Sequence, residues 1–114
     1  MQIIKTDFED SGFALRTVLR LATGGGVFAE FGTVKFPRGY RQPKDGVSVH
    51  DRDEISLVVH GRLAIECDGR NMEVVPGDLV HIPAGQAHAT EALEESQVYF
   101  ALIDARPEHT ALGR

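Results

Sequence analysis

The sequence predicts an all-β domain, either a sandwich or a barrel, and two observations support this fold class. First, apolar residues occur in short runs of four to ten residues that are rich in β-branched and aromatic types, which favours strands. Second, turn-forming Gly, Pro and Asp residues separate these runs at intervals of about eight to twelve residues, the spacing expected of a sandwich or barrel.

Seven runs are predicted to be strands, and the turn residues that interrupt the apolar pattern set their limits. Another segment, residues 13–22, fits both the alternation of a strand and a short helix, and we favour a strand. The seven runs are 27–36, 47–50, 55–60, 62–67, 72–75, 78–82 and 98–103.

Two of the intervening turns predict hairpins. Asp68-Gly69 suits a tight two-residue turn between antiparallel strands. Gly24-Gly25-Gly26, together with Ala29, has the spacing of a dinucleotide-binding loop, but no parallel βαβ unit surrounds it. We therefore expect a hairpin loop at these glycines rather than a nucleotide site.

Length and composition favour one globular domain covering residues 1–114. A chain of 114 residues can bury one core but is too short for two domains. Its 42% hydrophobic and 25% charged residues are close to the globular average, which excludes disorder and fibrous classes. We expect the core at about residues 13–103 and a surface tail at 104–114, with His109 in solvent.

The charge balance and the absence of long apolar runs argue against nucleic-acid and membrane partners. Twelve basic against seventeen acidic side chains give a net charge of -5, so we expect no nucleic-acid or anionic-membrane surface. No apolar run approaches the eighteen residues of a membrane span, and the first residues lack a signal-peptide layout. We therefore expect a cytoplasmic protein whose partners are small molecules or proteins.

Cys67 is the only cysteine, which agrees with a reducing compartment. It alternates with Leu63 and Ile65 along one face of a predicted strand. We therefore interpret Cys67 as a small buried apolar residue rather than a reactive thiol.

Three residues could combine as a metal site. His50 and Glu54 flank Asp51-Arg52-Asp53, which is predicted to turn and bring their side chains together. His88 follows a four-residue apolar stretch and the turn Pro83-Ala84-Gly85. A lone histidine is more often a hydrogen-bonded structural residue, but two imidazoles and a carboxylate at one cavity suit a divalent transition metal.

These residues also carry a resemblance to the cupin superfamily. GVSVHDRDEISLVVHG, from Gly46 to Gly61, resembles the first cupin motif, with His50 and Glu54 at its ligand positions. GDLVHIPAGQAH, from Gly77 to His88, is similar to the second motif, G-x5-P-x-G-x2-H, at each defined position. The resemblance implies a small single-domain cupin with a double-stranded β-helix, or jelly-roll barrel.

The chain departs from the cupin pattern at several positions. Ser48 replaces the first histidine of the H-x-H pair, the first-motif glycine is closer to the histidines than usual, and Ala92 stands where an asparagine is often found. The resemblance therefore implies three metal ligands, His50, Glu54 and His88, instead of four. This arrangement is similar to that of some cupin oxygenases with non-haem iron.

Two functions are consistent with such a site. The first is a metal-dependent oxygenase, isomerase or lyase that acts on a small chelating organic acid or enol, with Fe favoured and Mn, Ni or Zn as alternatives. The second is a non-catalytic small-ligand-binding cupin whose metal site is degenerate, which the loss of a ligand at Ser48 favours. Catalytic residues beyond the ligands cannot be assigned from the sequence.

Three residues are predicted to bind the substrate. Ser48 could donate a hydrogen bond, and Arg41 could attract an anion, although a charged loop is usually only solvated. His81 interrupts an apolar strand, and the pattern leaves open whether it faces the cavity or the outside of the sheet. The resemblance further implies a homodimer, to which residues 1–8 would contribute an added strand.

Overall fold

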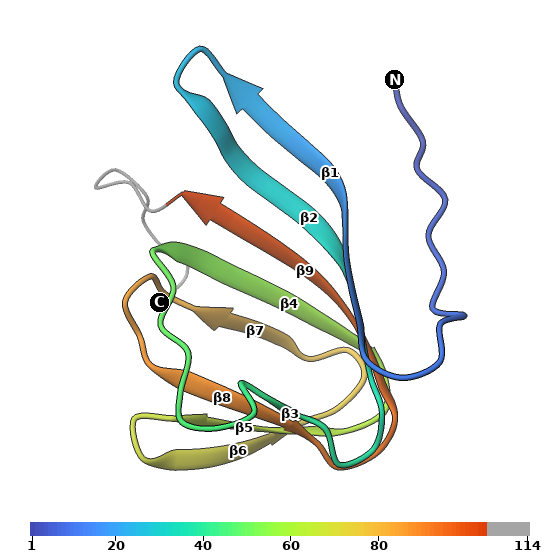
Figure 1. The fold of residues 1–114 in the computed structure, drawn as a ribbon, viewed down its shortest axis with the longest axis vertical. Helices are drawn as coiled ribbons and strands as arrows, with labels where there is room; N and C mark the ends of the chain where they lie inside the picture. Colours follow the sequence, from blue (N-terminus) through green and yellow to red (C-terminus); the bar gives the residue numbers. More distant parts are fainter. Residues whose placement is uncertain (105–114) are drawn as a thin grey trace.

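The computed structural model describes residues 1–104, and these form nine strands in two antiparallel sheets. One sheet has the strand order β1-β2-β9-β4-β7 and the other the order β3-β8-β5-β6. The two sheets face each other and enclose the interior of a jelly-roll β-barrel (Figure 1), which confirms the predicted fold class. The strands are β1 (Ala14–Thr23), β2 (Gly26–Phe36), β3 (Arg41–Gln42), β4 (Arg52–His60), β5 (Leu63–Cys67), β6 (Arg70–Val74), β7 (Leu79–Ile82), β8 (His88–Ala92) and β9 (Ser96–Asp104).

Both predicted hairpins form. β1 and β2 pair from Ala14 with Lys35 to Thr23 with Gly26, so residues 13–22 lie mainly in a strand and the glycines make its turn. β5 and β6 are joined through Asp68-Gly69, where the backbone φ angles are 53° and 73°. Two successive positive φ angles are the geometry that a tight hairpin turn requires.

The structure corrects the expected limits of several elements. Residues 47–50 are not a strand, because only Ser48 pairs, as an isolated bridge to His88. Arg52 and Asp53 do not belong to a turn, because β4 already begins at Arg52. β9 extends to Asp104, and the expected tail beyond it, with His109, lies outside the described residues.

The strand β8 was not predicted from the sequence. It begins at His88, after the Pro83-Ala84-Gly85 turn and the two residues that follow it, and pairs with both β3 and β5. β8 therefore lies inside its sheet and carries His88 into the barrel.

The hydrophobic core fills the end of the barrel where β9 begins. Burial of a valine, leucine or phenylalanine side chain contributes roughly 1.5 to 3 kcal/mol, so this cluster is a major source of stability. Its members, drawn from both sheets, are Val34, Phe36, Val58, Leu63, Ala92, Val98 and Phe100.

Gly61 allows the β4–β5 turn to pack closely against the start of β9. Its φ angle is 90°, and a Cβ atom there would lie 2.3 Å from the Glu95 carbonyl oxygen and from Ser96 Oγ. The fully buried Ser96 hydroxyl accepts a hydrogen bond from the Arg62 backbone N–H at 3.0 Å. The last glycine of the first motif is therefore required by this contact and by the backbone conformation.

The N-terminal segment, residues 1–13, forms no regular strand in this single chain. It packs against the first sheet through Tyr99, whose hydroxyl lies 2.7 Å from Thr6 Oγ1 and whose ring meets Phe8 edge to face. Lys35 Nζ donates a hydrogen bond to the Asp10 carbonyl at 2.6 Å. A strand formed by residues 1–8 on a second chain therefore stays a prediction. Residues 1–104 contain no helix that could span a membrane.

Candidate metal centre

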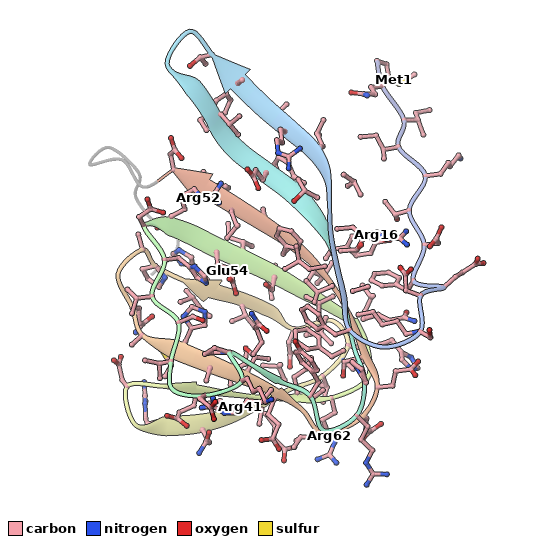
Figure 2. The ribbon with its side chains drawn as sticks, viewed as in Figure 1. Met1, Arg16, Arg41, Arg52, Glu54 and Arg62 are labelled. Carbon is pink, nitrogen blue, oxygen red and sulfur yellow. The ribbon has the colours of Figure 1, made fainter. Side chains whose placement is uncertain are left out.

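The alternation of β4 directs Glu54 into the barrel. Residues two apart on a strand share a face, so Glu54 lies on the same face as Ser56 and the buried Val58. Asp53 and Ile55 are therefore directed to the other face. Figure 2 shows Glu54 on β4, on the side of the sheet that faces the opposite sheet.

His88 is the most buried member of the site, with 4% of the residue exposed. Its backbone exchanges two hydrogen bonds with Ser48, from the Ser48 N–H at 2.8 Å and to the Ser48 carbonyl at 3.0 Å. On its other side His88 is in register with Cys67 of β5. Because directly paired residues of antiparallel strands point to the same face, Ser48 and Cys67 flank His88 on the inner face.

His50, Glu54 and His88 converge, as the sequence pattern predicts. Each offers a potential ligand atom, and these atoms all lie within 4.8 Å of one another. Glu54 Oε1 lies 3.7 Å from His50 Nε2 and 4.0 Å from His88 Nε2. The two imidazole rings have centroids 5.1 Å apart and are tilted by 51°.

A backbone carbonyl fixes the proton on His88. His88 Nδ1 lies 3.0 Å from the Gln86 carbonyl oxygen, which can only accept, so the proton of the neutral ring is on Nδ1. The lone pair of Nε2 is then free on the side of Glu54. Proteins commonly orient a metal-ligating histidine through a hydrogen bond from the ring nitrogen that does not bind the metal. Two imidazoles and one carboxylate, with His88 oriented in this way, fit a divalent transition metal.

The turn at Pro83-Ala84-Gly85 aligns both histidines. Gly85, with a φ angle of 85°, donates its backbone N–H to the His50 carbonyl at 2.7 Å. The Ala84 N–H donates to Asp53 Oδ1 at 2.9 Å, so the residue before Glu54 holds the same turn. This single turn therefore couples the backbone around all three candidate ligands.

The comparison with protein families agrees with these motifs. Residues 33–104 match the family described as "Cupin domain". The chain belongs to this family. No curated protein sequence gives a significant match to it.

Solved structures show the same fold. KdgF from Halomonas sp. is 26% identical, with a TM-score of 0.69 over 90% of this chain and 87% of that protein. A cupin superfamily protein from Desulfitobacterium hafniense is 17% identical, with a TM-score of 0.68 over 86% of this chain and 84% of that one. The Cnp3 cupin domain of Schizosaccharomyces pombe is 10% identical, with a TM-score of 0.73 over 91% of this chain and 76% of that domain.

A cavity of about 200 Å³ adjoins the three candidate ligands inside this cupin barrel. Ser48 lines it, beside His88, as expected for a group that could contact a substrate. Five further polar residues line the cavity and were not predicted from the sequence. Ser56 could have been found from the alternation with Glu54, whereas the other four depend on strand pairing between distant segments. The missed residues are Thr17, Glu30, Gln42, Ser56 and Thr90.

The structure does not bring His81 and Arg41 to this cavity. His81 pairs with the outward Ile55, and its Nε2 lies 3.0 Å from Asp53 Oδ2. Arg41 lies on the opposite sheet in register with Glu91, and its Nη1 donates to the Pro43 carbonyl at 2.8 Å. Figure 2 shows Arg41 on that sheet, across the barrel from Glu54. Strand alternation therefore separates both residues from the cavity with the ligands.

Cys67 is half-buried on the inner face and does not join the group of candidate ligands. Burial raises the pKa of its thiol, the neighbouring Asp68 charge adds to this effect, and Arg70 opposes it. A raised pKa leaves little thiolate at neutral pH, which agrees with a thiol of low reactivity.

Proposed function

We propose that this cupin is a metal-dependent enzyme that acts on a small chelating organic acid or enol, through oxygenation, isomerisation or elimination. The observation that carries the proposal is the convergence of two imidazoles and one carboxylate beside a cavity. Three protein ligands leave positions on a transition metal for a substrate. We favour Fe(II), because this ligand set is typical of non-haem iron oxygenases, with Mn, Ni and Zn as alternatives.

A bound metal would supply Lewis acidity and a template for the substrate. The chain contributes the rest. His50, Glu54 and His88 would hold the ion, and the hydrogen bond from His88 Nδ1 to Gln86 keeps the ring oriented. The Ser48 hydroxyl lines the cavity beside His88, where it would donate a hydrogen bond to an oxygen of the bound acid.

The first experiment measures metal content. The protein is purified without chelators or an immobilised-metal column, and Fe, Mn, Ni and Zn are quantified per chain in the wild type and in His88→Ala. We expect close to one equivalent of one metal in the wild type and a large loss in the variant. Content below about a tenth of an equivalent, unchanged by the mutation and not restored by added metal, would contradict the proposal.

The second candidate function is a non-catalytic module that binds a small ligand in the same cavity. Ser48 favours it, because a neutral hydroxyl is a poor metal ligand and occupies a position where cupins often place a histidine. A module of this kind would bind ligands without metal, and added metal would not raise its melting temperature. The elemental analysis and a thermal scan with and without metal separate the two functions.

We also propose that the protein forms a homodimer. Support comes from β1, whose long outer edge is unpaired within residues 1–104. An unpaired edge can accept a strand, and residues 1–8 have the apolar alternation to provide one. Light scattering tests this, since a mass of one chain, 12.5 kDa, would exclude the dimer.

A further inference from the structure

The cavity beside the candidate ligands changes character with depth, and the strand registers define its levels. At the mouth, Glu54 pairs with Leu102 and Leu102 with Glu30. Glu30 is not a candidate metal ligand, and its carboxylate faces two cations. Its Oε1 lies 3.5 Å from Arg20 Nε and 3.6 Å from Arg52 Nη1. The charged groups of the cavity wall are therefore confined to this level.

The middle level carries neutral polar groups around an aromatic ring. Here Ser56, Phe100, Gly32 and Thr17 are in register on one sheet, and Gln42, Thr90 and Ile65 on the other. The hydroxyls of Ser56, Thr17 and Thr90 form no hydrogen bond with another residue of the described part of the chain. They remain available to a ligand.

Gly32 lets the ring of Phe100 lie close to the sheet at this level. A Cβ atom on Gly32 would lie 2.7 Å from two ring carbons of Phe100. The ring therefore occupies the space that a side chain at position 32 would fill. This leaves the middle of the cavity open and gives it an apolar wall.

The floor is entirely apolar. Val58, Val98, Val34 and Leu15 are in register on one sheet, and Leu63 faces them from the other. A ligand group that reached this level would find no hydrogen-bonding side chain. Burying a polar group there without a partner costs roughly 1 to 3 kcal/mol or more, whereas an apolar group gains from burial.

We propose that the ligand is a small carboxylic acid with a chelating oxygen at one end and an apolar group about the size of a six-membered ring at the other. The chelating end lies against His50, Glu54 and His88, and the apolar end lies against Phe100 and the valine floor. The cavity of about 200 Å³ exceeds the roughly 150 Å³ that admits benzene in an apolar protein cavity. This inference rests on the proposed metal site for its chelating end only.

The test is a ligand series on protein loaded with Zn(II), which binds chelating acids without redox chemistry. Isothermal titration compares glycolate, mandelate and malate, which share a 2-hydroxy acid and differ in hydrogen, phenyl or carboxymethyl as the other group. We expect mandelate to bind at least about tenfold more tightly than glycolate, and malate no more tightly than glycolate. Equal binding of glycolate and mandelate, or tightest binding of malate, would overturn the inference.

Thr17→Phe gives an independent test of where the ring lies. Thr17 is on the edge strand β1, beside Gly32 in the middle level, and is not a candidate metal ligand. Thr17→Phe should fill the cavity and reduce the preference for mandelate over glycolate to less than about threefold, with Zn(II) stoichiometry unchanged. Thr17→Val, which replaces the hydroxyl with a methyl group of similar size, should keep the preference.

Retention of the full preference in a folded Thr17→Phe protein would contradict the placement of the ring. If circular dichroism shows that this variant is unfolded, the wild-type series decides alone. If Zn(II) does not bind, the proposed function fails, and the apolar end is tested separately by titrating benzyl alcohol into the metal-free protein. Saturable binding of benzyl alcohol, blocked in Thr17→Phe, would support the apolar compartment, and its absence would overturn it.

Discussion

The two segments that supply the histidines are supported in different ways. Residues 83–88 hold His88 through the Asp53 carboxylate, a hydrogen bond within the turn from the Gln86 N–H to the Pro83 carbonyl at 3.2 Å, and β8. Residues 46–51 form no strand, and the backbone hydrogen bonds of Ser48 and His50 go to His88 and Gly85. Residues 46–51 are therefore positioned by residues 83–88.

The side chains of the two histidines differ in the same way as their backbone segments, because His88 is more firmly held than His50. The His88 side chain is 5% exposed and forms a hydrogen bond through Nδ1. The His50 side chain is 42% exposed, and within the described residues its ring forms polar or ring contacts only with Glu54 and His88. A preorganised ligand loses less conformational freedom when a metal binds. We infer that His88 determines the geometry of the site and that His50 completes it.

The largest expected effect is the difference between His88→Gln and His50→Gln. We expect His88→Gln to reduce Zn(II) affinity by roughly a hundredfold or more, because it removes the preorganised ligand, and His50→Gln to reduce it by less. Competition with a chromogenic chelator measures both affinities, and circular dichroism checks the folds. An equal or greater loss in His50→Gln would show that the burial and bonding of His88 do not make it the dominant ligand.

Asp53→Ala should have the next largest effect. Asp53 accepts the Ala84 N–H, so its loss should loosen the turn that orients both histidines and reduce metal affinity about 10-fold to 100-fold. His81→Gln is the matched control, because it alters the contact between His81 and Asp53 Oδ2 and leaves the Ala84 hydrogen bond to Asp53 Oδ1 in place. Similar losses in the two variants would assign the effect to the outer pair rather than to the turn.

Much of this site could be predicted from the sequence, because turn residues set its geometry. The spacing of Gly77, Pro83, Gly85 and His88 predicts a strand and then a turn that leads to the histidine. In the structure β7 lies between Gly77 and Pro83, and His88 follows the turn at Gly85. Strand β8 escaped prediction because its residues His88, Thr90 and Ala92 line a cavity wall or are small. A strand that faces a polar cavity lacks the apolar alternation by which strands are recognised.

The side of the barrel on which a residue lies was harder to predict. Val47 and Val49 favour a strand by type, yet only Ser48 between them pairs, and the two valines are 51% and 60% exposed. His81 and Arg41 are directed outward by strand register, and register cannot be carried across a turn from the sequence alone. Residue type therefore predicted which residues could bind a metal or substrate, while strand pairing decided which of them face the same cavity.

Ser48→His tests residues 46–51, the segment that forms no strand, by adding a candidate ligand instead of removing one. Ser48 is paired with His88 and lines the cavity, so a histidine there would supply a fourth protein ligand. We expect Zn(II) affinity to rise about tenfold, less than the loss in His88→Gln, because the new ligand also lies in the segment without a strand. Ser48→Asn is the control for size. Unchanged affinity in the histidine variant would mean that residue 48 cannot reach the ion.

The smallest effect is expected at Cys67, which flanks His88 on the side opposite Ser48. Because burial raises the pKa of this thiol, its reactive thiolate becomes abundant only at a higher pH than the thiolate of an exposed cysteine does. Iodoacetamide should therefore modify Cys67 more slowly than glutathione at pH 7.5, with the difference shrinking as the pH rises. Cys67→Ala should change Zn(II) affinity less than about twofold, since Cys67 does not join the group of ligand atoms formed by His50, Glu54 and His88. A loss comparable to that in Asp53→Ala would instead make Cys67 part of the metal centre, and both flanks of His88 would then contribute to it.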